Sequence, residues 1–223
     1  GNIGNTKLYE TKNSDGTISR IEKGTIAITS NGSLVQNGGS LYGETIDLAA
    51  GKDIENIQIT AGDTVYVSAV HDATGKNAPE QNTIDLTING AYQAKGNVVL
   101  GHIGSVVKNG NTYNTLENST GITGLVDIRT TGREGSISQK ENGSIVSDRI
   151  NLTSEHGSIY GQKKEDGTYT ALKVYAGQQP IGLDTLDASI NAIAKGNISL
   201  EQTAGDMRIG QIISQEGDVN LNV

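Results

Sequence analysis

The chain has 223 residues, of which 34% are hydrophobic and 4% aromatic, with thirty glycines, two prolines and no Cys, Phe or Trp. Its formal net charge of −8 argues against nucleic acid or an anionic membrane as partner, because phosphate binding depends on clustered Lys and Arg. The lack of cysteine excludes disulfides, Cys-ligated zinc and cysteine nucleophiles. No apolar run could span a bilayer, so we expect no membrane insertion, and no linker divides the chain, so residues 1–223 are expected to form a single elongated unit.

Glycine recurs at the head of short apolar strands along the chain. One block, Gly24-TIAITSN-Gly32-SLVQ-NG-Gly39-SLYG, returns later as Gly135-SISQKEN-Gly143-SIVS-DRINLTSEH-Gly157-SIYG. Matching these copies predicts that Tyr42 and Tyr160 occupy equivalent corners. A repeated glycine, small polar residue and branched apolar residue are typical of a solenoid whose repeated unit is a strand.

Between the glycines, short segments alternate apolar and polar residues, which predicts strands with one buried face. These segments are residues 25–29, 45–50, 57–60, 64–70, 83–88, 97–101, 126–130, 149–153, 197–201 and 218–223. Residues 186–196 fit a short helix or a strand, and a strand is favoured because the neighbouring segments are strands. The glycines at the breaks are interpreted as residues with the positive φ of tight turns.

Three segments do not fit the repeat: residues 8–22, 106–117 and 160–175. In each, an Asp-Gly or Asn-Gly turn separates two extended runs, which predicts a protruding antiparallel hairpin. Residues 71–83 contain Pro79 and are interpreted as a loop. Tyr113 and Tyr169 follow hairpin turns, where burial is least expected, and are therefore the candidate ligand contacts. Tyr66 is expected to belong to the sheet.

The fold class predicted is all-β, a right-handed parallel β-helix with protruding hairpins. At about 20–25 residues a coil, the chain would form about eight to ten coils. An antiparallel sandwich is disfavoured because it usually shows longer strands and buried aromatic residues.

Strands such as GNISL at 196–200 and GDVNL at 217–221, with no Cys and many Asn and Gly, resemble the shaft of filamentous-haemagglutinin-type exoproteins of two-partner secretion systems. The resemblance implies a secreted or surface-held bacterial adhesin, exported through an outer-membrane transporter. Its partner would be a host-cell surface protein, a matrix protein or a glycan. The Asn-Pro-Asn-type motif of that family's secretion domain is absent, so we expect an internal segment of a larger protein.

The predicted function is structural and adhesive, without catalysis. One alternative is a purely mechanical shaft of an adhesin or contact-dependent toxin. A second is a polysaccharide-active enzyme, for which Asp127, Asp148, Asp184 and Asp187 would have to converge on one face. The three histidines, His71, His102 and His156, share no metal-ligand spacing. No catalytic, cofactor-binding or metal-binding residue is predicted.

Overall fold

The computed structural model describes residues 3–4, 11–12, 18–19, 24–51, 53–72, 82–88, 96–109, 112–115, 124–147, 149–176, 189–203 and 205–223. These residues form strands and turns, and none of them belongs to a helix that could cross a membrane. The strands are β1 (Ile3–Gly4), β2 (Thr11–Lys12), β3 (Ile18–Ser19), β4 (Thr25–Ser30), β5 (Leu34–Val35), β6 (Leu41–Ala50), β7 (Ile54–Asp72), β8 (Asn82–Ile88), β9 (Asn97–Asn109), β10 (Thr112–Thr115), β11 (Gly124–Thr130), β12 (Ile137–Ser147), β13 (Arg149–Ser154), β14 (Leu172–Ala176), β15 (Ser189–Ala194), β16 (Ile198–Gln202), β17 (Ile209–Ser214) and β18 (Val219–Asn222). Strand β15 confirms the strand interpretation within residues 186–196.

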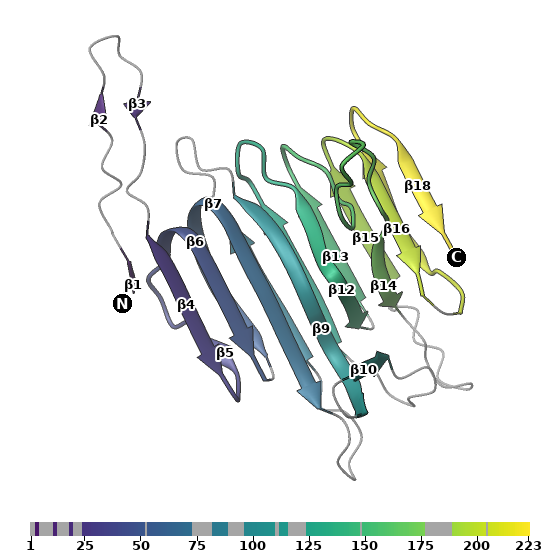
Figure 1. Cartoon of the computed structure of the whole chain (residues 1–223), viewed down its shortest axis with the longest axis horizontal. Helices are drawn as coiled ribbons and strands as arrows, with labels where there is room; N and C mark the ends of the chain where they lie inside the picture. Colours follow the sequence, from purple (N-terminus) through teal and green to yellow (C-terminus); the bar gives the residue numbers. More distant parts are fainter. Residues whose placement is uncertain are drawn as a thin grey trace.

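Two ladders of parallel strands account for most of the pairing. Ladder A contains β4, the second parts of β6 and β7, and then β9, β12, β14, β16 and β18. Ladder B contains β5, the first part of β7, and then β8, β11, β13, β15 and β17. The chain alternates between the two ladders, so neighbouring strands in each ladder come from successive passes of the chain, ending at β18 in ladder A and at β17 in ladder B (Figure 1).

The core consists of rows of aliphatic side chains, one from each successive strand. In ladder A the paired residues Ile46, Val65, Val98, Ile137, Ile159 and Ile198 are all 0% or 1% exposed. In ladder B the corresponding row contains Ile54, Val126, Ile150 and Ile190, with the same burial. Parallel pairing in register places like residues above one another, so branched aliphatic side chains suffice to fill this interior.

Glycine at the corners between ladder B and ladder A is required by close packing. A Cβ on Gly157 would lie 2.5 Å from the carbonyl oxygen of Gly135, in the preceding corner. Positive φ occurs at Gly38, Gly39, Gly96, Gly167 and Gly205, and not at Gly135, Gly157, Gly196 or Gly217. The positive-φ interpretation is therefore wrong for these four corner glycines, and at Gly157, Gly196 and Gly217 the stacking of successive corners leaves no room for a Cβ.

The small polar residue after each corner glycine links one corner to the next. Asn97 Oδ1 accepts the Ser136 N–H at 3.2 Å, and Ser136 Oγ accepts the Ser158 N–H at 3.1 Å. Ser158 Oγ accepts the Asn197 N–H at 3.0 Å, and Asn197 Oδ1 accepts the Asp218 N–H at 2.8 Å. The Gly-[SND]-[IV] pattern thus encodes a stacked glycine, a hydrogen-bond acceptor and a core residue, in that order.

At two places, a glutamine side chain hydrogen-bonds the backbone of another strand in the way that a neighbouring strand would. Gln139 Oε1 accepts the Lys173 N–H at 2.9 Å, and Gln139 Nε2 donates to the Lys173 carbonyl at 3.1 Å. Gln202 makes the same pair of bonds with Ala176, both at 3.2 Å. Each amide therefore mimics a peptide group and satisfies backbone groups that are partly buried at Lys173 and buried at Ala176.

The repeat alignment drawn from the sequence is wrong for its tyrosines. Tyr42 lies at the start of β6 and pairs with Thr60 of β7. Tyr160 directly follows Ile159, which pairs with Ile137 and Ile198 in ladder A. Val65 pairs with Val98, Val98 with Ile137 and Ile137 with Ile159, so Val65 and Ile159 belong to the same row of ladder A. Tyr66 and Tyr160, which follow these two residues, therefore hold equivalent positions. Bulges and hairpins of unequal length shift the sequence repeat away from the structural one.

Candidate functional site: the tyrosine hairpin

Antiparallel pairing occurs in each of the three segments where hairpins were expected. β2 pairs with β3 through Thr11 with Ser19 and Lys12 with Ile18. β10 folds back on the end of β9, so that Tyr113 stands opposite Lys108. The side chain of Tyr113 and residues 73–81 of the expected loop lie outside the described part of the chain.

The third segment is described in full, and we call residues 160–171 the tyrosine hairpin. Backbone hydrogen bonds join its two arms: Thr170 N–H donates to Gln162 O, and Gly161 N–H donates to Thr170 O, both at 2.8 Å. Lys163 forms an antiparallel bridge with Tyr169. The expected turn is present, because Gly167 at its tip has φ of 82°.

Asp166 fixes the tip of the tyrosine hairpin. Its Oδ1 accepts the Thr168 hydroxyl at 2.6 Å and the Thr168 N–H at 2.9 Å. These two bonds favour the carboxylate and hold the pKa of Asp166 below its usual value. The Asp-Gly pair therefore supplies both the side-chain cap and the backbone conformation of the turn.

The tyrosine hairpin ends at residue 171, whereas the sequence predicted that it would extend to residue 175. Residues Leu172–Ala176 form β14, a parallel strand of ladder A between β12 and β16. Leu172 and Val174 are fully buried in the core. The protrusion is thus shorter than the sequence predicted, because the apolar-polar alternation of residues 172–174 belongs to a core strand and not to the hairpin.

Two tyrosines pack together at the base of the hairpin. The rings of Tyr160 and Tyr169 have centroids 4.4 Å apart and are tilted by 50°. Tyr169 remains 40% exposed, whereas Tyr160 is half-buried. Burial, and then the neighbouring Tyr169, raise the pKa of Tyr160, which a hydrogen bond with Ser136 partly opposes. Tyr160 therefore holds the Tyr169 ring in place while one side of that ring faces solvent.

The rest of the hairpin offers polar groups beside the aromatic surface. Residues 162–169 are all exposed. Gln162, the two lysines and the two acidic residues that follow it line a shallow, open depression of about 490 Å³. This combination of an exposed Tyr ring with donors and acceptors of both charges suits binding by stacking and hydrogen bonding.

Tyr66 belongs to the sheet, as expected. It lies in β7, and the Lys140 ammonium is 4.9 Å from the centroid of its ring. Tyr66 is therefore engaged with a cation of its own chain.

Of the four aspartates considered for catalysis, only Asp127 is described. It stands on β11, where Asn151 Nδ2 donates to its Oδ2 at 3.4 Å, and Asn191 Nδ2 in turn donates to Asn151 Oδ1 at 2.9 Å. Asp148, Asp184 and Asp187 lie outside the described residues, as do the side chains of His71 and His102. His156 is exposed at a corner, and no group of three potential metal ligands occurs among the residues that the structure covers.

Sequence reasoning predicted that Tyr169 would be exposed but missed Tyr160 as its packing partner. The two tyrosines flank the Glu-Asp-Gly turn at unequal distances, Tyr160 five residues before Glu165 and Tyr169 two residues after Gly167, so sequence spacing did not indicate their packing. No protein-family model, curated protein or solved structure matches this chain.

Proposed function

We propose that the chain is a right-handed parallel β-helical segment of a large secreted bacterial surface exoprotein of the filamentous-haemagglutinin type, and that it acts in adhesion without catalysis. The alternation between two parallel ladders supports this fold, since parallel crossovers are nearly always right-handed. The stacked corners and the absence of cysteine also agree with a chain that is exported unfolded and folds outside the cell.

The observation that carries the adhesive role is the tyrosine hairpin. It leaves ladder A between Ile159 and Leu172, both fully buried, and presents a partly exposed Tyr169. The frame is thus anchored on both sides of the protrusion, so the contact surface is held in place before a ligand arrives. Preorganisation of this kind lowers the entropic cost of binding. The partner would be a host-cell surface protein, a matrix protein or a glycan.

A binding screen of the intact chain against host cells, matrix proteins and a glycan panel tests this function. The informative variant is Tyr169→Ser, and the matched control is Tyr66→Ser on ladder A. If Tyr169 is a central contact, its loss weakens binding by about tenfold or more, equivalent to about 1.4 kcal/mol, while the control binds normally. Equal binding by the intact chain and Tyr169→Ser would contradict a role for the hairpin.

The corner hydrogen-bond chain supports a second candidate, a purely mechanical shaft. It runs from Asn97 through three intermediate corners to Asp218, which is the kind of continuous cross-linking that stiffens a rod. In that case the hairpins would serve to deter lateral strand pairing. A well-folded chain that binds nothing in the screen would favour this function over adhesion.

A further inference from the structure

We propose that the side-chain amide of Asn37 is lost spontaneously, so that this position is a site of chemical modification in the folded protein. An asparagine followed by glycine is prone to cyclise, because no side chain shields the backbone nitrogen that attacks the amide carbon. Asn-Gly pairs occur in the sequence at Asn31, Asn37, Asn89, Asn109 and Asn142. The structure describes both residues of the pairs at 31, 37 and 142, and these three differ in how their reacting groups are held.

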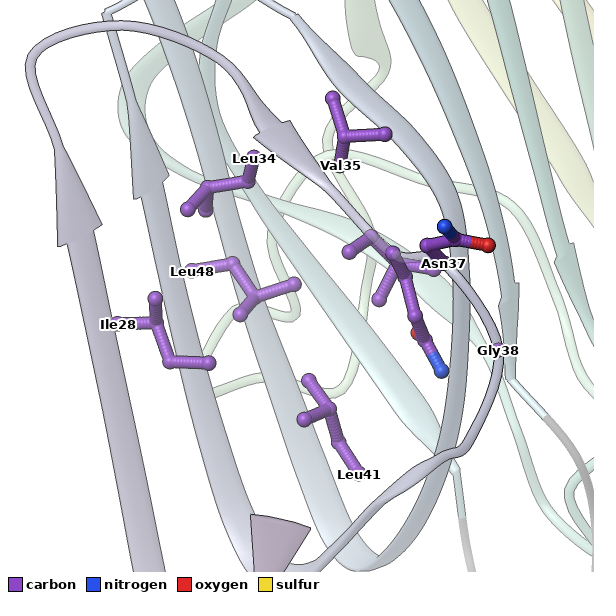
Figure 2. Close-up of a pocket in the computed structure, with 9 residues that line it drawn as sticks. Ile28, Leu34, Val35, Asn37, Gly38, Leu41 and Leu48 are labelled. Atoms are coloured by element: carbon purple, nitrogen blue, oxygen red, sulfur yellow. The ribbon is translucent and has the colours of Figure 1, made fainter. Parts of the chain in front are cut away.

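Asn37 lies on a loop that bows outward from the side of the stacked strands. Val35 pairs with Glu55 and Leu41 pairs with Ile59, so the five residues 36–40 span the distance that the three residues 56–58 span in the next coil. The extra length forces this loop away from its neighbours, and Figure 2 shows the Asn37 amide directed away from the apolar groove beside it. The exposure of Asn37 thus follows from the length of its own loop.

The reacting groups of this pair are open. Asn37 and Gly38 are exposed, and neither the Asn37 amide nor the Gly38 N–H takes part in a hydrogen bond within the described part of the chain. The Gln36 amide closes the loop by donating to Gly39 O and leaves both groups unoccupied. A Cβ built at Gly38 would meet nothing within 4 Å, so nothing crowds the attacking nitrogen. Since φ is 77° at Gly38 and 86° at Gly39, two residues with glycine's conformational freedom allow the loop to adjust during the reaction.

The same dipeptide is held in place at the other two described positions. The Gly32 N–H, which would attack the amide of Asn31, donates to Ser30 Oγ at 3.1 Å. The glycine of the pair that begins at Asn142 is buried, and a Cβ there would lie 2.9 Å from Leu100 O. A nitrogen that is hydrogen-bonded or tightly packed has to be released before it attacks, so both pairs should react more slowly than the pair at Asn37.

Water is the co-reactant that this reaction requires. The Gly38 nitrogen bonds to Asn37 Cγ, the Cγ–Nδ2 bond breaks, and the amide leaves as ammonia with the proton that the Gly38 nitrogen gives up. Water then opens one of the two C–N bonds of the succinimide ring, which gives an aspartate linked through its α- or its β-carboxyl group. Either product places a new carboxylate beside the groove of Figure 2, and the β-linked product adds one carbon to the main chain of the loop.

Peptide mapping by mass spectrometry tests the site. The folded chain is incubated at mildly alkaline pH in water labelled with a heavy oxygen isotope, and electron-transfer fragmentation separates the α-linked from the β-linked product. Position 37 should take up the label several-fold faster than positions 31 and 142. In the urea-unfolded chain the three rates should become similar, because all three glycine nitrogens are then equally open.

Ser30→Ala is the matched variant, because it frees the Gly32 N–H and leaves the loop at Asn37 unchanged. It should raise the rate of label uptake at position 31 and leave the rate at position 37 as it was. The proposal is overturned if position 37 of the folded chain reacts no faster than positions 31 and 142. It is also overturned if the lead of position 37 persists in urea, since the fold would then not be its cause.

Discussion

Substituting Gly157 by alanine tests the claim that the corner glycines are needed for space. The added Cβ would lie 2.5 Å from Gly135 O and from Ser136 Oγ, whereas ordinary contacts begin at 3.4 Å, so the corners would have to separate by about 0.9 Å (3.4 − 2.5). That movement opposes the Ser154 hydroxyl, which donates to Gly135 O at 2.6 Å and accepts the Gly157 N–H at 3.1 Å.

The magnitude follows from these contacts. Overpacking costs about 1–3 kcal/mol, and a weakened hydrogen bond adds about 0.5–1.5 kcal/mol. The gain from restricting the unfolded chain offsets about 0.4–1 kcal/mol, so Gly157→Ala should lose about 0.5–4 kcal/mol of unfolding free energy. Gly24→Ala is the matched control, because a Cβ there meets nothing within 4 Å, and it should be neutral or slightly stabilising. Urea unfolding measures both, and equal stability of the two variants would refute the steric explanation.

Three further predictions concern the ladders and the hairpin. Gln139→Leu should lower the unfolding free energy by about 1–3 kcal/mol for each Lys173 backbone group left without its partner, measured by urea unfolding; an unchanged midpoint would show that the amide is dispensable. Because the raised pKa of Tyr160 keeps its proton on the folded chain while the unfolded chain loses it, stability should fall as pH rises above about 10, and Tyr160→Phe should flatten that decline; identical pH profiles would refute this. Asp166→Ala removes the side-chain oxygen that caps the turn, so hydrogen exchange at the Thr168 amide should accelerate while ladder amides keep their rates; no change at Thr168 would contradict the cap.

Local pattern was sufficient to predict many of the strands, but not β14, which was assigned to a hairpin, or β17. The alternation at residues 25–29 and 149–153 matches β4 and β13, because inward and outward residues alternate in any half-buried strand. The Asp-Gly turn likewise marked the tip of the tyrosine hairpin, since its chemistry lies within a few residues.

What depended on distant partners could not be predicted. Gln139 reads as an ordinary polar residue until Lys173, 34 positions away, is placed beside it. The role of Gly157 is decided by Gly135 in the preceding corner, not by its own φ. Tyr42 and Tyr160 were matched by sequence spacing, but the intervening bulges place them at different positions in the ladders.

The candidate site was predictable to a similar degree. The position of Tyr169 after a tight turn indicated its exposure, whereas its packing against Tyr160 arises from the antiparallel closure of the whole hairpin. The end of the hairpin at Ala171 depends on Leu172 entering the core, which the local alternation does not reveal.

The most direct test of the account is a variant in which residues 162–169 are replaced by Asn-Gly, joining the paired residues Gly161 and Thr170. Unfolding midpoint and binding to the partner found in the screen would be measured on the same preparation. The account predicts an unchanged midpoint, because no residue of the core rows is removed, together with loss of binding. Binding that survives the replacement, or a ladder that unfolds without the hairpin, would contradict the division into a supporting frame and a binding protrusion.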